Sequence, residues 1–158
     1  MIYVKDLIEV CNGKLLCGDI NLPLNNFSKD TRLINKDDVY IGIKGESFDG
    51  NKFYKDALDK GASVCILDNI DEVDDKYKDK TIVKVEDTIK AIGLLAKYKR
   101  SLYNIPVVAV TGSVGKTSTK DMIAAVLSTE YKVLKTEANY NNHIGLPLKI
   151  LKLTDEDI

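Results

Sequence analysis

One segment constrains the fold more than any other: a glycine-containing turn that joins an apolar run to a helical pattern. The apolar run at residues 107–110 is typical of a strand buried on both faces of a parallel sheet. The turn reads Thr-Gly-Ser-Val-Gly-Lys-Thr-Ser over residues 111–118, and a helical pattern continues to about residue 128. Glycines there let the backbone curl around phosphate oxygens, while amides at the helix start point at the anion. The segment therefore predicts a phosphate site in an α/β fold.

The residues of this turn have expected roles at a bound nucleotide. Lys116 can reach the terminal phosphates as a point charge and is the expected catalytic residue, and the Thr117 hydroxyl is positioned to bind Mg²⁺. The motif is the short G-x-x-G-K-T, because Val110 stands where the longer phosphate-loop pattern has glycine. The alternative, a glycine turn before a surface lysine, is disfavoured by the flanking strand and helix. The expected nucleotide contacts are Gly112, Ser113, Val114, Gly115, Lys116, Thr117 and Ser118.

The first hundred residues carry the signals of a smaller α/β unit. Apolar runs predict strands at residues 14–17, 39–43, 63–67 and 81–85. Helical periodicity predicts helices at residues 4–11, 53–60 and 87–103, with Gly13 ending the first and Asp87 capping the last. We expect a solvated loop at residues 68–80 and a further strand at residues 132–134. We assign residues 1–84 to one domain, and residues 85–158 to a linker helix and the incomplete beginning of a second, parallel-sheet domain.

Composition excludes several functional classes. Lys and Arg number 23 against 24 Asp and Glu, for a net charge of −1, which argues against a protein that holds nucleic acid by bulk charge. The sequence has one histidine, His143, and three cysteines that lack metal-ligand spacing, which argues against a zinc site built from these residue types. No apolar run reaches the length of a membrane span, and the charged first ten residues do not resemble a secretory signal. We expect a cytoplasmic protein that does not bind nucleic acid and does not insert into a membrane.

Three segments together resemble the Mur ligase family, whose members build the peptide stem of bacterial cell-wall precursors. The first is the short phosphate loop with Lys120 four residues after Lys116. The others are the asparagine-rich residues 136–148 and the N-terminal residues 27–50. The latter two look like segments of the family member that adds D-alanyl-D-alanine to UDP-N-acetylmuramoyl-tripeptide. The resemblance covers most of the chain in the family's order.

The resemblance implies a function for each half of the chain. The N-terminal domain would hold the uridine diphosphate end of the substrate, and the central domain would bind ATP and Mg²⁺. In the family, ATP phosphorylates a substrate carboxylate, and the amine of D-alanyl-D-alanine then attacks the acyl phosphate. The implied substrate contacts are Ser28, Asp30, Arg32, Lys44, Gly45, Phe48, Asn139 and Asn142.

Several of these residues also have a purely structural interpretation. Asp30 and Arg32 could form only a local turn, and Phe48 could stack on a base or anchor its loop in the core, where we favour the anchor. Lys120 could be a solvated helix lysine. Asn139, Asn141 and Asn142 could occupy turn positions that tolerate a left-handed backbone, and Asn142 is the preferred functional member. His143 is expected to be a surface residue.

The resemblance also implies that more protein is needed for catalysis. Family members contain three domains, so we expect this chain to be an N-terminal fragment that does not ligate alone. The alternatives are a Mur ligase that adds a single amino acid, or a non-catalytic module that binds nucleotide sugars. A GTPase is disfavoured because no Asn-Lys-x-Asp segment follows the phosphate loop. We expect a monomer, with self-association through the edge of the incomplete sheet left open.

Overall fold

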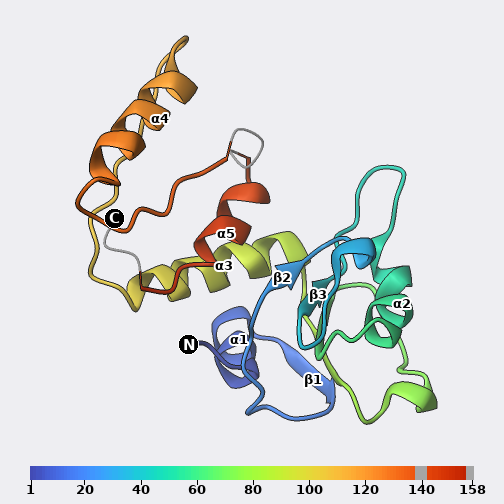
Figure 1. Cartoon of the computed structure of the whole chain (residues 1–158). Helices are drawn as coiled ribbons and strands as arrows, with labels where there is room; N and C mark the ends of the chain where they lie inside the picture. Colours follow the sequence, from blue (N-terminus) through green and yellow to red (C-terminus); the bar gives the residue numbers. More distant parts are fainter. Residues whose placement is uncertain (138–141, 156–158) are drawn as a thin grey trace.

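The computed structural model describes residues 1–137 and 142–155 and has a mixed α/β architecture (Figure 1). Its sheet has the strand order β1-β5-β4-β3-β2, in which β2 to β5 are parallel and β1 runs antiparallel to β5. The strands are β1 (Lys14–Cys17), β2 (Phe27–Ser28), β3 (Val39–Ile41), β4 (Val64–Leu67) and β5 (Thr81–Lys84). Four of the five strands are thus confirmed predictions. The two-residue β2 was missed, because so short an element shows no periodicity.

The core lies on both faces of the sheet, so the central strands are buried throughout. Along β4, Val64 and Ile66 join one apolar cluster, while Cys65 and Leu67 join the other. The first face is covered by α1 (Val4–Cys11) and α3 (Thr88–Ser101), and the second by α2 (Tyr54–Asp59). This two-sided cover explains why the parallel strands are apolar without alternation.

The helix predictions in this region are confirmed with small corrections. The Asp87 carboxylate accepts a hydrogen bond from the Lys90 amide at 2.8 Å and so caps α3 as predicted. At the end of α1, Asn12 takes a left-handed conformation, and the amide of Gly13, the residue predicted to end the helix, donates to the Ile8 carbonyl oxygen at 2.9 Å. Residues 68–80 are not wholly solvated, since Ile70 and Tyr77 are buried against the α2 face. Ile70 and Tyr77 were not predicted to be buried because most of their neighbours in the sequence are charged.

The region after residue 104 departs most from prediction. The helix α4 (Lys116–Leu127) forms as predicted, but residues 107–110 and 132–134 form no strands. Val107 and Val108 are 69% and 53% exposed, so the run expected inside a sheet faces solvent. A strand needs hydrogen bonds from a neighbouring strand, whereas a helix supplies its own. Figure 1 accordingly shows α4 standing away from the sheet.

The last described helix was not predicted. α5 (Gly145–Ile150) packs along α3, and its Leu148 is buried in the same cluster as the α1–α3 face. Its six residues are too few to reveal a period. Among the described helices, none combines the length and the apolar character needed to cross a membrane.

Candidate functional site

The backbone of the phosphate loop, residues 111–118, is exposed and has a conformation that can bind an anion, although no described strand lies beside it. Gly115 takes a left-handed conformation, φ +79°, at the position that starts α4, and Gly112 has φ +153°. Residues 111–119 are exposed, so the first amides of α4 face solvent. These amides and the positive end of the helix dipole favour a bound anion. The predicted nucleotide contacts therefore lie together on one accessible turn.

Lys116 closes over this turn. Its Nζ donates hydrogen bonds to the carbonyl oxygen of Gly112 and, at 3.4 Å, to that of Ser113. The cation thus lies against the loop that would surround the phosphates. Moving the ammonium from these carbonyls to phosphate oxygens would exchange neutral acceptors for charged ones, which bind it more strongly.

Lys120 links α4 to the asparagine-rich segment. Its Nζ donates to the carbonyl oxygen of Thr136 and lies 3.2 Å from the Asp121 carboxylate. The side chain is only 22% exposed, so the interpretation as a solvated helix lysine is wrong. The sequence could not show this burial, because it comes from the segment around Thr136, which packs against this turn of α4.

The asparagine-rich segment is only partly described. Asn139 and Asn141 lie outside the described residues. The Oδ1 of Asn142 accepts hydrogen bonds from the amides of Ile144 at 3.1 Å and Gly145 at 2.7 Å, at the start of α5. Asn142 therefore has a structural role at a helix start, and its contact with substrate stays a prediction. His143 is exposed, as expected.

The other predicted substrate residues gather at one edge of the sheet. Ser28 ends β2 and is followed by Asp30 and Arg32, while Lys44, Gly45 and Phe48 follow the carboxyl end of β3. Because these strands are parallel, their carboxyl ends meet at the edge where open α/β sheets bind ligands. The strand order thus brings together residues that are well separated in the sequence.

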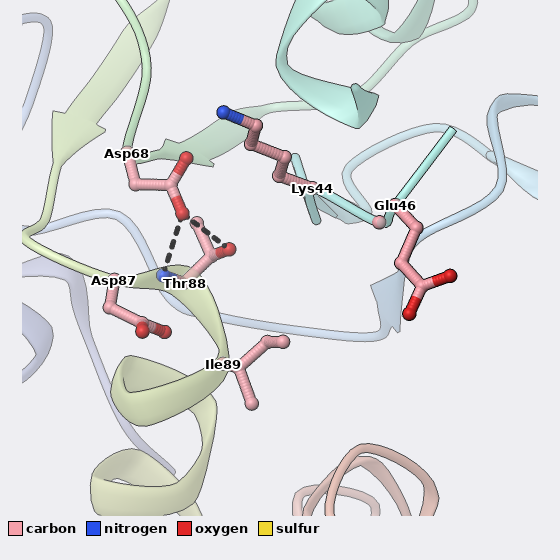
Figure 2. Close-up of a pocket in the computed structure, with 7 residues that line it drawn as sticks. Lys44, Glu46, Asp68, Asp87, Thr88 and Ile89 are labelled. Carbon is pink, nitrogen blue, oxygen red and sulfur yellow. Dashed lines mark hydrogen bonds between the residues drawn. The ribbon is translucent and has the colours of Figure 1, made fainter. Parts of the chain in front are cut away.

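A cleft of about 480 Å³ opens at this edge (Figure 2). Its lining residues are Lys44, Gly45, Glu46, Asp68, Asp87, Thr88 and Ile89. Of the predicted substrate contacts that the structure describes, Lys44 and Gly45 line it and the others do not. Asp68 and Thr88 were not predicted as site residues. Asp68 directly follows the predicted strand at residues 63–67, and Thr88 lies three residues after the one at residues 81–85. Their places after the carboxyl ends of parallel strands were the available signal.

The Asp30–Arg32 turn has the local geometry that the structural interpretation anticipated. The Arg32 guanidinium donates to the Asp30 carboxylate at 2.6 Å through Nη2 and 2.9 Å through Nε, and the Asp30 carbonyl accepts from the Ser28 hydroxyl at 3.0 Å. Hydrogen bonds from Arg32 lower the pKa of Asp30 to about 2. The Arg32 side chain is still 84% exposed, so its guanidinium can also reach a ligand.

Phe48 does not anchor its loop in the core. It is 54% exposed and stacks on the half-exposed ring of Phe53, with ring centroids 5.1 Å apart. The loop is pinched by pairing of Lys44 with Asp49, and the Gly45 amide donates to the Phe48 carbonyl at 2.7 Å. This tight turn directs the ring outward, so our preferred interpretation of Phe48 is wrong.

The side chains present suit a phosphate-bound cation better than a protein-only metal site. Within the described ranges, no group of three or more His, Cys, Asp or Glu side chains could hold a metal ion. The exposed Thr117 hydroxyl, at the first turn of α4, can supply one oxygen. Mg²⁺ commonly binds one or two protein oxygens together with substrate phosphates, which this arrangement allows.

Comparison with known proteins matches both halves of the chain to one family. A model described as "Mur ligase family, catalytic domain" matches residues 25–100, and one described as "Mur ligase middle domain" matches residues 110–158. The UDP-N-acetylmuramoyl-tripeptide–D-alanyl-D-alanine ligase of Bacillus subtilis is 38% identical over 153 residues, which cover 96% of this chain and 33% of that protein. The chain thus spans about a third of the length of the curated relatives it matches.

Solved structures show the same similarity. MurF from Acinetobacter baumannii superposes with a TM-score of 0.85 and 29% identity, over 96% of this chain and 33% of that one. MurF from Thermotoga maritima, solved in complex with ADP, gives a TM-score of 0.74 and 34% identity, over 84% of this chain and 30% of that one. The mixed α/β fold expected from the sequence is thereby confirmed.

Proposed function

This chain belongs to the Mur ligase family, and we propose that it is part of an ATP-dependent ligase that joins D-alanyl-D-alanine to UDP-N-acetylmuramoyl-tripeptide. The observation that carries the proposal is the exposed phosphate loop at residues 111–118, inside the segment that matches the family's middle domain. The names of the relatives supply the substrates. Residues 85–158 would bind ATP, and residues 1–84 would bind the uridine diphosphate end.

In this proposal the phosphate loop positions ATP and neutralises its charge. The loop amides would hold the phosphate oxygens, and Lys116 would leave the Gly112 carbonyl to contact the terminal phosphates. Thr117 would provide a hydroxyl ligand to Mg²⁺, whose charge makes the phosphates more electrophilic. A carboxylate is a poor electrophile, so its phosphorylation is needed before an amine can form the amide.

The edge of the sheet would bind the uridine substrate. Lys44 in the cleft and Arg32, which follows the neighbouring parallel strand β2, would supply cations for the diphosphate. Arg32 would then share its donors between Asp30 and a phosphate oxygen. Ser28 would contribute hydrogen bonds near the same turn.

The ligation itself is proposed for a longer protein. The relatives are about three times as long as this chain, so we propose that the chain alone binds ligands without forming the amide. A monomeric state and a cytoplasmic location are further parts of the proposal. Addition of a single amino acid, the main alternative, would be revealed by the amine that drives ADP release in the full enzyme.

Calorimetric titration with UDP-N-acetylmuramoyl-tripeptide tests the proposal. We expect saturable binding that Arg32→Ala weakens about tenfold, the usual scale for losing a charge-assisted hydrogen bond. Lys78→Ala is the matched control, because it removes an exposed cation that is also paired with a nearby aspartate. Absence of binding to the folded chain, or equal weakening by both variants, would contradict the assignment of residues 1–84.

A further inference from the structure

Asn51 is a buried amide that no motif in the sequence singled out. It lies directly after the loop that follows β3 and is 3% exposed. Its Nδ2 donates to the carboxylates of Asp49 and Asp68, at 2.8 Å each. Its Oδ1 accepts from the amides of Asp68 at 3.0 Å and Asn69 at 3.3 Å. Both ends of the side chain are therefore used, and they join the β3 loop to the end of β4.

The network continues from Asp68 to the start of α3. The second carboxylate oxygen of Asp68 accepts from the Thr88 amide at 3.1 Å and interacts with the Thr88 hydroxyl at 3.0 Å (Figure 2). Thr88 is fully buried, and its hydroxyl also lies 3.2 Å from the carbonyl oxygen of Gly42. Asn51 and Asp68 thus connect three elements around the cleft: the β3 loop, the end of β4 and the start of α3.

Close packing leaves the loop little freedom at its base. The Gly50 amide donates to the Ile43 carbonyl at 3.0 Å, and a Cβ on Gly50 would lie 2.6 Å from that oxygen. A Cβ on Gly42 would lie 2.9 Å from the Asn51 Oδ1. The backbone therefore approaches Asn51 closely, and Lys44, beside this base, is placed at the cleft.

A neutral side chain is required at position 51. Its amide donates to two carboxylates at once, and the hydrogen bond from Asn51 lowers the pKa of Asp49. A carboxylate at the same position would place a third negative charge between them and donate to neither. Aspartate has almost the same shape as asparagine, so this change tests the donors with little change in volume.

We propose that Asn51 is a positioning residue for the uridine substrate: it holds the loop at residues 43–50 so that Lys44 faces the diphosphate. This inference rests on the proposed function. Asn51 acts through Lys44 and has no direct contact with the substrate. Its loss should therefore weaken binding at the cleft and leave the phosphate loop at residues 111–118 unaffected.

The first experiment compares Asn51→Asp with the wild-type chain in two titrations. We expect the dissociation constant for UDP-N-acetylmuramoyl-tripeptide to rise about tenfold and that for ATP with Mg²⁺ to stay unchanged. Amide exchange of Gly45 and Gly50, both hydrogen-bonded within the loop, should become faster. Thr81→Val is the matched control, since it is an isosteric loss of a buried hydrogen-bonding group at the amino end of β5, the opposite edge of the sheet.

A second variant separates positioning from general destabilisation. Combining Asn51→Asp with Asp68→Asn reverses donor and acceptor across the same contact, so it should recover part of the affinity and of the amide protection. The inference is overturned if Asn51→Asp binds and exchanges like the wild type, if Thr81→Val has the same effects, or if the swapped pair recovers neither property. If the wild-type chain does not bind the uridine substrate, the proposed function fails, and unchanged exchange at Gly45 and Gly50 would separately overturn the loop-ordering role of Asn51.

Discussion

Of two four-residue apolar runs in this chain, one forms a buried strand and the other forms no strand. Val64–Leu67 forms β4, is buried at every position and pairs with β3 and β5. Residues 107–110 are just as apolar, yet they form no strand, and Val107 and Val108 are exposed. The difference lies in the neighbours, because a strand is stabilised only by hydrogen bonds and packing from other segments.

The helices of the two regions differ in the same way. α3 buries Ala91, Ile92, Leu95 and Ala96 against the sheet, whereas Ala124 is the buried residue of α4. Met122 and Val126 of α4 are 70% and 69% exposed. A helix closes its own hydrogen bonds and can keep its shape without packing. The phosphate loop consequently retains its local geometry where the strand before it does not form.

The largest predicted contrast comes from one substitution made in both runs. Val64→Ala should lower the free energy of unfolding by about 2–3 kcal/mol, because it leaves a void in a fully buried strand. Val108→Ala should change it by less than about 0.5 kcal/mol, because the side chain already faces solvent. Urea unfolding measures both. Equal losses would show that residues 107–110 are packed in solution and would remove the contrast.

Two glycines with positive φ, Gly18 beside the sheet and Gly115 in the phosphate loop, compare the packing of the two regions. Gly18→Ala should cost about 2 kcal/mol or more, since φ is +96° and the new Cβ would lie 2.5 Å from the Thr81 Cα. Gly115→Ala should cost about 1 kcal/mol from strain alone, because at φ +79° its nearest neighbour would be 4.0 Å away. Thermal unfolding of the two variants tests this order, which tight packing around Gly115 would reverse.

A substitution in the phosphate loop should weaken nucleotide binding without lowering the stability of the protein. Lys116→Ala should weaken binding of ATP with Mg²⁺ at least tenfold, about 1.4 kcal/mol, because a charge-assisted contact is lost. The melting temperature should not change, because this exposed lysine makes its described hydrogen bonds to carbonyl oxygens of its own loop. Lys97→Ala, on the exposed surface of α3, controls for the loss of a charge. Equal affinity for ATP in the two variants would contradict the role of Lys116.

Lowering the pH should have the smallest effect on stability, and it should destabilise both the sheet region and the region around α4. The pKa of Asp30 is lowered to about 2 by Arg32, and the pKa of Asp121 is lowered by Lys120 and Lys135. A lowered carboxyl pKa stabilises the fold above the unfolded-state pKa, near 4, and this contribution disappears as the pH falls through the folded value. Both carboxylates are accessible to solvent, so each contribution is small.

Melting curves between about pH 2 and pH 7 check this expectation. Asp30→Asn and Asp121→Asn should each melt slightly below the wild type at neutral pH. The differences should shrink toward pH 2, where the wild-type carboxylates also become protonated. A difference that stays constant across the range would mean that the ion pairs do not contribute.

The part of the candidate site that could be predicted from the sequence was the contiguous turn at residues 111–118. Gly115 and Lys116 could be identified because a phosphate loop is a contiguous turn whose backbone and charge are encoded side by side. The cleft could be predicted only in part, since Asp68 and Thr88 belong to it through the order of parallel strands. Asn51 gave no sequence signal, because its partners come from other elements.

The sequence by itself determined helices α1 to α4 and the glycine turn at residues 111–118, which depend on residues close together in the chain, and it predicted four of the five strands. Only the tertiary structure decided which of the predicted strands form, so that residues 64–67 are a buried strand and residues 107–110 are not. It also decided that Phe48 faces solvent, that Lys120 is covered, and that Asn51 joins three elements. Local hydrogen bonds and backbone preferences are properties of a segment, whereas burial and strand pairing depend on which distant segments lie beside it.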